Sequence, residues 1–443
     1  MSFHEFGNAH IEKMVEIQDG NRTKRIPLVQ HWLHHPLTPR FETVDYRLGV
    51  AQADMPETLN LWRGFQLGLK PGWADFALGP EGPVPVTNGL FDGPEMPPGY
   101  CDMFLNHMLN NMCGGDNEIL TFLLGWIADA FWNPGPCESA VILTGPQGSG
   151  KTVWVESIME FFGIHAITVD DPEQLVGNFN KHLQNKSLVF AVEAFFAGNR
   201  QHAAKLKTLV TRRDLFIFIE PKGVDGFVVP KKFRLVMASN DEHVIRAERD
   251  DRRNLVLAVD AREHNQDHEY FARMRDEWIH GGRRALFRWL TGAYWGRSVG
   301  KDKFRMWSRP QTAALQAQKD LSLSKPQMAI YNMLRDGDVP GLHKVDAEQG
   351  TVFVATVALI DANRLGLEHQ RILGDTLRVL AGPDAKSARE YLGEGSARRQ
   401  YRGFWLPPLD ECRRRWESHQ GHPVQWPTRA RELTPLKIRA ERK

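Results

Sequence analysis

The stretch Val141–Thr152, which reads VILTGPQGSGKT, decides the fold of this chain. Its apolar start leads into Gly145–Thr152, which matches the phosphate-binding loop G-x-x-x-x-G-K-[ST] in full. In such a loop the glycines let backbone N–H groups face the β-phosphate, the lysine neutralises β- and γ-phosphate oxygens, and the hydroxyl after it ligates Mg²⁺. A helix that begins near Lys151 adds its positive dipole end. The sequence therefore predicts a site for a nucleoside triphosphate. Its residues are Gly145, Pro146, Gln147, Gly148, Ser149, Gly150, Lys151 and Thr152.

The composition is typical of a soluble globular protein with two or three domains, since 42% of the 443 residues are hydrophobic and 25% are charged. The longest apolar segment, Ile119–Trp132, is interrupted by Gly125 and Asp129 and is shorter than the roughly 20 residues of a membrane span. The N-terminus lacks the apolar core of a signal peptide. The four cysteines show no C-x-x-C spacing, so neither a zinc site nor a disulfide framework is indicated. We expect a cytoplasmic protein with no membrane partner.

Positive charge gathers at the C-terminal end. From Arg398 to Lys443 there are twelve Lys or Arg against five Asp or Glu, a local charge of +7 in a chain whose net charge is +2. Such an end favours a polyanionic partner, with a solvated charged tail as the alternative.

The strand pattern predicts an α/β core with a mostly parallel, buried sheet, because short apolar runs alternate with helical stretches. The predicted strands after the first are Leu188–Val192, Leu215–Ile219, Leu235–Ala238 and Leu255–Val259. The predicted organisation is an irregular α+β segment (1–100), a helical segment (101–138), the core (139–300), a linker (301–322) and a basic C-terminal domain (323–443).

The C-terminal segment suggests a winged helix, because helices precede a basic ribbon at Ala397–Leu406. His369–Leu380 would then be the groove helix. The predicted wing residues are Arg398, Arg399, Tyr401 and Arg402. An oligomerisation or packing module would have the same pattern.

Polar residues at two strand ends are candidates for catalysis. Glu193 follows an apolar strand and can act as general base toward the attacking water. Asn240 follows another and can bind the γ-phosphate or position that water. The alternative for Glu193 is a solvent-facing strand end.

Basic residues near the core are candidates for contact with nucleic acid or for an arginine finger. Lys222 lies in the turn of a predicted hairpin over 215–229 and, with Lys207, is a candidate for contact with a nucleic-acid phosphate. An exposed Lys-Gly turn is the alternative. Arg249, Arg252 and Arg253 precede the last predicted strand, and one of them could be an arginine finger. A finger acting in trans would tie hydrolysis to a subunit interface, and hence to a ring.

Four elements in this order, from Gly145 to Asn240, resemble motifs A, B, B′ and C of superfamily 3 helicases, the compact AAA+ ring helicases of DNA viruses, phages and plasmids. The flanks Asn60–Phe65, Cys113–Asp116, Leu123–Ala128 and Trp405–Arg413 resemble phage primase-helicase proteins. The resemblance implies an AAA+ core in which Lys151 and Thr152 bind ATP and Mg²⁺.

The same resemblance implies that Glu193 is catalytic and lies at the metal, that Asn240 is the sensor, and that Lys222 tracks DNA. Arg253 would be the finger, with Arg252 or Arg249 as substitutes. The implied partners are single-stranded or forked DNA, further copies in a hexameric ring and a separate primase or polymerase, in a bacterial host cytoplasm.

Two features depart from that family. Val192 stands where an acidic residue usually precedes the catalytic glutamate, which weakens the predicted Mg²⁺ site. Such proteins often carry a primase-polymerase domain upstream, and we expect none in this sequence, because the residues before the core are too few to form one. The leading hypothesis is an ATP-driven DNA helicase. An ATP-gated DNA-binding scaffold is the second, favoured by Val192. A small-molecule kinase is the third, and it leaves the Lys222 hairpin and the basic end unexplained.

Overall fold

The computed structural model describes residues 14–19, 22–35, 38, 40–66, 77–79, 82–84, 93–96, 99–193, 200–211, 216–223, 225–301, 303–424 and 426–427. The chain divides into two units, Met1–Val86 and Thr87–Lys443. The basic tail from residue 428 onward lies outside the described residues. Within the described ranges no helix has both the length and the apolar character that a bilayer crossing requires.

The first unit is irregular, as expected, and consists of short paired strands. Its elements are β1 (Met14–Asp19), β2 (Arg22–Pro27), α2 (Leu28–His34), β3 (Thr43–Asp45), η1 (Gln52–Asp54), β4 (Thr58–Asn60), β5 (Ala77–Gly79) and β6 (Gly82–Val84). Asn60 organises the loop around β4, since its buried amide donates to the carbonyls of Arg47 and Val50 and accepts from two backbone N–H groups. Side-chain hydrogen bonds thus replace regular secondary structure here.

The second unit is built on a five-stranded parallel sheet, which confirms the predicted α/β core. The strands are β7 (Ala140–Thr144), β8 (Ala166–Val169), β9 (Leu188–Val192), β12 (Arg234–Ser239) and β13 (Asn254–Ala258), in the order β13-β7-β12-β9-β8. All five residues of β7 are buried, as expected for a central strand covered on both faces.

One predicted strand of this sheet was wrong. The run at Leu215–Ile219 forms β10 (Phe216–Ile219), which among the described residues pairs with β11 (Phe227–Pro230) alone. This antiparallel pair is the hairpin that was predicted over 215–229, and Leu215 lies outside the described residues. Phe216 and Phe218 are exposed while Ile217 and Ile219 are buried, so only one face of the hairpin packs on the core. The fifth strand of the sheet is instead β8, a short edge strand that the sequence analysis missed.

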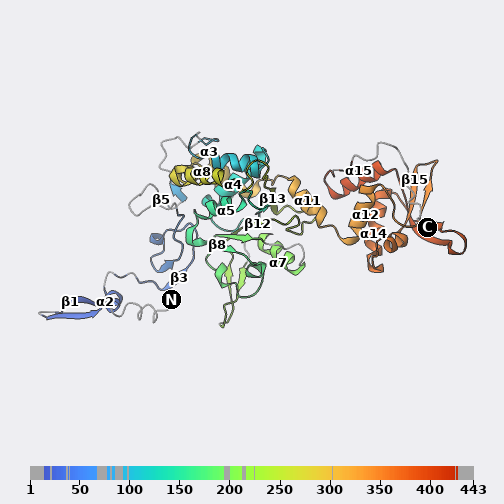
Figure 1. The fold of residues 1–443 in the computed structure, drawn as a ribbon. Helices are drawn as coiled ribbons and strands as arrows, with labels where there is room; N and C mark the ends of the chain where they lie inside the picture. The colour runs from blue at the N-terminus through green and yellow to red at the C-terminus, as the bar shows by residue number, and fades with distance from the viewer. Residues whose placement is uncertain are drawn as a thin grey trace. The chain divides into compact units, whose positions relative to one another are not determined.

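Helices gather around the sheet. They are α3 (Asp102–Asn106), the π-helical turn η2 (His107–Met112), α4 (Asn117–Trp132), α5 (Lys151–Met159), α6 (Pro172–Val176), α7 (Arg200–Thr211), α8 (His268–Glu277), the π-helical turn η5 (Trp278–Gly282), α9 (Arg283–Leu290) and α10 (Ala293–Val299), with the 3₁₀ turns η3 (Gly163–His165) and η4 (Lys181–Leu183). Helices before the phosphate loop pack on helices after the sheet: α3 lies against α8, and α4 against α9 and α10 (Figure 1). Segments far apart in sequence therefore form one helical layer.

A buried ion pair joins this layer to the sheet. Arg234 on β12 donates to the Asp129 carboxylate of α4 at 2.7 Å, and both side chains are 1% exposed. The same guanidinium donates to the carbonyls of Trp126 and Asn133 and of Gly135, near the end of α4. The charge that interrupts the apolar segment Ile119–Trp132 is thus a specific partner of the central sheet.

The linker expected over 301–322 is part of the core instead. It contains η6 (Lys303–Met306) and α11 (Ala313–Leu321), which packs on β13, and Leu315 belongs to the apolar core under the sheet. The Gln318 side chain accepts from the backbone N–H groups of Val244 and Ile245 at 2.9 and 3.1 Å. The prediction of a linker was wrong because polar side chains of this segment form hydrogen bonds with buried backbone groups of the core, and composition alone does not reveal such bonds.

The C-terminal part has the element order of a winged helix with one added strand. Its elements are α12 (Lys325–Asp336), β14 (His343–Asp346), β15 (Thr351–Ala355), α13 (Thr356–Ala362), η7 (Leu367–His369), α14 (Gln370–Ala381), β16 (Ala388–Leu392), η8 (Gly395–Ala397), β17 (Arg399–Leu406) and α15 (Leu409–Gln420). The antiparallel sheet order is β14-β15-β17-β16. The predicted ribbon Ala397–Leu406 is mostly one strand, β17, and its hairpin partner is β16.

Candidate nucleotide-binding site

The phosphate loop connects β7 to α5 through glycines in conformations that other residues rarely adopt. Gly145 has φ +139° and Gly150 has φ +88°. A Cβ on Gly145 would lie 2.6 Å from the carbonyl oxygen of Val259, and one on Gly150 would lie 2.6 Å from Nε2 of His107. The motif glycines are therefore required by both backbone conformation and space.

Lys151 is turned back onto the loop. Its Nζ donates to the carbonyl oxygens of Gly145 at 2.6 Å and Pro146 at 2.8 Å, and to Oδ1 of Asn240 at 3.0 Å. Burial lowers the pKa of this ammonium, and the negative charge of Glu193 opposes the shift. The cation is thus placed inside the loop with acceptors that phosphate oxygens could replace.

Asn240 links Lys151 to Glu193. The Asn240 amide donates to Glu193 Oε1 at 2.7 Å, and its backbone N–H to Oε2 at 3.3 Å. The two residues follow β12 and β9, which are parallel neighbours, so their carboxyl ends meet beside the phosphate loop. Glu193 itself has φ +50°, an uncommon conformation for a residue with a Cβ. The structure thus brings together three of the residues that the sequence singled out.

The loop and helix fit a phosphate group. No side chain caps the N-terminus of α5, a nine-residue helix, and its first turn carries Thr152 exposed. Of the predicted metal ligands, the Thr152 hydroxyl and the Glu193 carboxylate are oxygen donors of the kind Mg²⁺ prefers. Val192 is half-buried and adds no carboxylate, and the described residues contain no group of three or more His, Cys, Asp or Glu that could hold a metal. These donors fit a nucleotide-bound Mg²⁺, which keeps waters and phosphate oxygens as further ligands, rather than a metal held by protein alone.

Two residues that sequence reasoning missed lie against the loop. His107 is buried beside Gly150, and Gln266 donates its backbone N–H to the Gly148 carbonyl at 3.1 Å. Burial, and then the nearby His264, lower the pKa of His107 to about 4, so its ring is neutral at pH 7. Neither residue belongs to a local motif, and both reach the loop only through the fold.

The arginine-finger candidates lie at the opposite edge of the sheet. Asn254, the first residue of β13, pairs with Ala140, whereas the phosphate loop follows Thr144 at the other end of β7. At about 3.3 Å per residue, the length of β7 separates the two edges by roughly 16 Å. Arg253 is also held by the buried Asp251 at 2.7 Å. Arg252 and Arg249 are exposed. The structure therefore does not bring these arginines to Lys151 of the same chain.

The DNA-contact candidates lie apart from the nucleotide residues. Lys222 is exposed in the turn between β10 and β11. Lys207, on α7, is ion-paired with Glu248 at 2.6 Å. Arg398, Arg399 and Arg402 belong to the C-terminal part of the chain, in and before β17.

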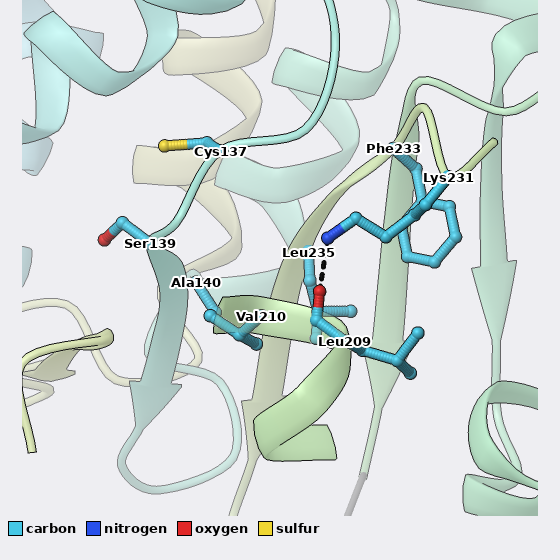
Figure 2. A pocket seen from close by; sticks show the side chains of 8 residues that line it. All are labelled: Cys137, Ser139, Ala140, Leu209, Val210, Lys231, Phe233 and Leu235. Atoms are coloured by element: carbon cyan, nitrogen blue, oxygen red, sulfur yellow. Dashed lines mark hydrogen bonds between the residues drawn. The ribbon is translucent and has the colours of Figure 1, made fainter. Parts of the chain in front are cut away.

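A buried lysine lies where the hairpin returns to the sheet. Lys231, after β11, is 4% exposed and donates to the Leu209 carbonyl of α7 (Figure 2). It lines a cavity of about 10 Å³, room for one water, together with Cys137, Ser139, Ala140, Val210, Phe233 and Leu235. Burial lowers the pKa of Lys231 to about 8. This side chain anchors the hairpin to α7.

Comparisons with known proteins agree with this fold. A model for a family of unknown function (DUF5906) matches residues 143–253, from the strand before the phosphate loop to Arg253. A comparison with curated proteins gave no match. The A-form apo structure of the NrS-1 C-terminal region is similar with a TM-score of 0.53 and 15% identity, covering 90% of this chain and 95% of that chain. The apo structure of the NrS-1 C-terminal region (305–718) gives 0.54 and 18%, covering 90% and 94%. At these identities the likeness shows the fold: a P-loop-like α/β core with flanking segments.

Proposed function

We propose that this chain hydrolyses ATP with Mg²⁺ and uses the energy to translocate on single-stranded DNA as a ring helicase. The observation that carries the proposal is the Lys151–Asn240–Glu193 arrangement. An ammonium, an amide and a carboxylate lie there in one hydrogen-bonded series beside the phosphate loop, at the carboxyl ends of parallel strands, which supports nucleotide hydrolysis.

Each residue has a separate part in this proposal. Lys151 and the N–H groups of the loop would bind the β- and γ-phosphates, and Thr152 would ligate Mg²⁺, which neutralises the developing charge. Glu193 would accept a proton from the attacking water, while Asn240 holds that carboxylate in position. Lys222 would contact a DNA phosphate at the tip of the hairpin.

The placement of the arginines supports a ring. Because Arg249, Arg252 and Arg253 precede β13 at the edge away from the phosphate loop, a finger from this cluster would act on the ATP of a neighbouring copy. Arg252 is better suited than Arg253, whose guanidinium is held by Asp251. This assignment differs from the one implied by the sequence resemblance.

A second function is favoured by Val192. Without a carboxylate there, the chain could bind ATP and assemble on DNA with little hydrolysis, acting as a gated scaffold. The two proposals differ in turnover, so the test is ATP hydrolysis with and without single-stranded DNA, together with unwinding of a forked duplex.

Glu193→Gln is the decisive variant, and Glu118→Gln, an exposed glutamate on α4, is its matched control. DNA-stimulated turnover and strand separation that Glu193→Gln alone abolishes would support the motor. ATP and DNA binding with turnover no higher than that of Glu193→Gln would reject the helicase and support the scaffold. A small-molecule kinase would show no stimulation by DNA.

A further inference from the structure

The sheet of the C-terminal part has one face that helices cover only in part. Along β15 and β17 this face carries Val352, Val354, Phe404 and Leu406, which are buried against Leu373 and Leu377 of α14. From Phe404 toward the N-terminal end of β17, the helices no longer cover this face, and its side chains are exposed. This uncovered part of the face is polar.

Strand register places the residues of this uncovered face. Arg402 lies directly opposite Arg389, and Gln400 directly opposite Tyr391. Because side chains alternate along a strand, these four share the face of Phe404, and all four are exposed. Arg399 and Leu392 form the next pair and belong to the other face, where Leu392 is buried.

Two more arginines extend this surface. The Arg398 guanidinium lies over the Tyr391 ring at 5.5 Å, and that of Arg378, on α14, lies over Phe404 at 5.9 Å. We call the resulting surface the wing face. It consists of Arg378, Arg389, Tyr391, Arg398, Gln400 and Arg402.

The positive charge of the wing face is not neutralised. Within the described part of the chain Arg389, Arg398 and Arg402 form no ion pair, and Arg402 donates instead to the Ser387 hydroxyl at 2.9 Å. Arg378 faces Asp375 at 3.8 Å, with both side chains more than half exposed, so that pair is weak. Like charges directly opposite on a sheet are destabilising, and Arg389 opposite Arg402 is such a pair. A polyanion on this face would remove the repulsion.

We propose that the wing face binds the phosphate backbone of duplex DNA. Surfaces for single strands combine charge with a series of aromatic platforms for bases, whereas this face has one aromatic ring, Tyr391, which Arg398 already covers. The exposed side of α14 is poorly suited to contact base edges, because the Asp375 carboxylate lies between Arg371 and Arg378 and faces both guanidinium groups. The contact is therefore sequence-independent and electrostatic, and it positions the duplex beside the chain.

This second nucleic-acid surface does not rest on the motor activity proposed above. It needs no ATP and no residue of the phosphate loop, so each proposal can fail alone. A chain without ATPase activity could still bind duplex through the wing face.

The test measures binding of the full chain, without nucleotide, to a labelled duplex of mixed sequence over a series of salt concentrations. Arg389→Ala with Arg402→Ala should weaken binding and reduce the slope of log affinity against log salt by about 2, one for each lost phosphate contact. Binding of a fluorescent ATP analogue should stay unchanged, which shows that the core is intact.

The matched control removes equal charge elsewhere: Arg399→Ala, on the other face, with Arg414→Ala, which is paired with Glu411 on α15. This control should leave the slope unchanged. An equal loss in both double variants would overturn the proposal, since net charge alone would then explain it. A loss confined to a single-stranded probe, tighter binding of an RNA duplex, or no loss at all would overturn it as well.

Discussion

Glu193 and Asn240 are joined by a 2.7 Å hydrogen bond between the carboxyl ends of β9 and β12. The amide that holds the carboxylate also accepts from Lys151, so the two strand ends and the phosphate loop are set by one side chain. Loss of this amide should affect the chemical step more than nucleotide binding.

Asn240→Ala should therefore lower ATP turnover about 100-fold, the size expected when a catalytic group loses its orientation. The dissociation constant for ATP should change much less, because Lys151 and the loop remain. Turnover assays and titration with a fluorescent ATP analogue measure the two effects. Asn110→Ala, an exposed asparagine in η2, is the control and should change neither. Equal losses in binding and turnover would contradict this role for Asn240.

Gly150→Ala should abolish ATP binding, because a Cβ at φ +88° is strained and would meet His107. The second substitution His107→Ala should relieve only one of two contacts, because the same Cβ would also lie 2.7 Å from Cε1 of Phe271. The backbone strain remains as well, so Gly150→Ala with His107→Ala should recover binding only in part. Titration with the ATP analogue compares the variants. Full recovery would show that the contact with His107 alone explains the requirement for glycine, and no recovery would show that the position of His107 is irrelevant.

Arg234→Met should destabilise the core by about 3–5 kcal/mol, because Asp129 would remain buried without its partner. Arg234→Met with Asp129→Leu should recover much of this loss, since apolar replacements of buried pairs are often well tolerated. Urea unfolding gives the free energies. Arg414→Met, which breaks an exposed pair with Glu411, should cost at most about 1 kcal/mol. A double variant as unstable as Arg234→Met alone would show that the guanidinium matters chiefly through the carbonyls it binds.

Lys231 should make stability depend on pH in the alkaline range. Its pKa is lowered to about 8, against an ordinary value near 10.5, so the folded chain binds fewer protons than the unfolded chain between these values. Stability contributed at this site therefore rises as pH increases from about 8 to 10.5, and is flat below pH 8. Thermal unfolding gives the Tm of the wild type and of Lys231→Met. The Tm of the wild type should rise relative to that of Lys231→Met as the pH increases from about 8 to 10.5. A Tm difference that stays constant over this pH range would contradict the lowered pKa of Lys231.

The sequence was sufficient for those parts of the fold that carry local patterns. The phosphate loop, the strands around Val189, Val236 and Val256, and the helix predicted at His369–Leu380 lie where periodicity and turn residues put them, the last as α14 (Gln370–Ala381). The approach of Glu193 and Asn240 was also predictable, because residues after neighbouring parallel strands meet at one edge.

The remainder depends on contacts between distant segments. β8 is an edge strand of only four residues, and periodicity is ambiguous for so short an apolar run. The run at Leu215–Ile219 was assigned both to the sheet and to a hairpin, because an apolar run looks the same in either, and only the hairpin formed. The wing residues could not be assigned to faces until β16 was known to be the partner of β17. His107 reaches Gly150 only because the helices before and after the sheet form one layer.

Both ends of one excursion of the chain meet beside the phosphate loop. After Glu193 the chain leaves the sheet, forms α7 and the β10–β11 hairpin, and returns along β12 to Asn240, where Val192 and Ala238 are paired neighbours. The hairpin with Lys222 is thus connected on both sides to the residues of the candidate nucleotide site, Glu193 and Asn240. Leu206 and Val210 of α7 and Ile217 and Ile219 of β10 belong to the apolar core under the sheet, so exchange of the whole excursion would disturb that core. A longer turn at Lys222 would instead extend the reach of the hairpin and leave the core residues in place.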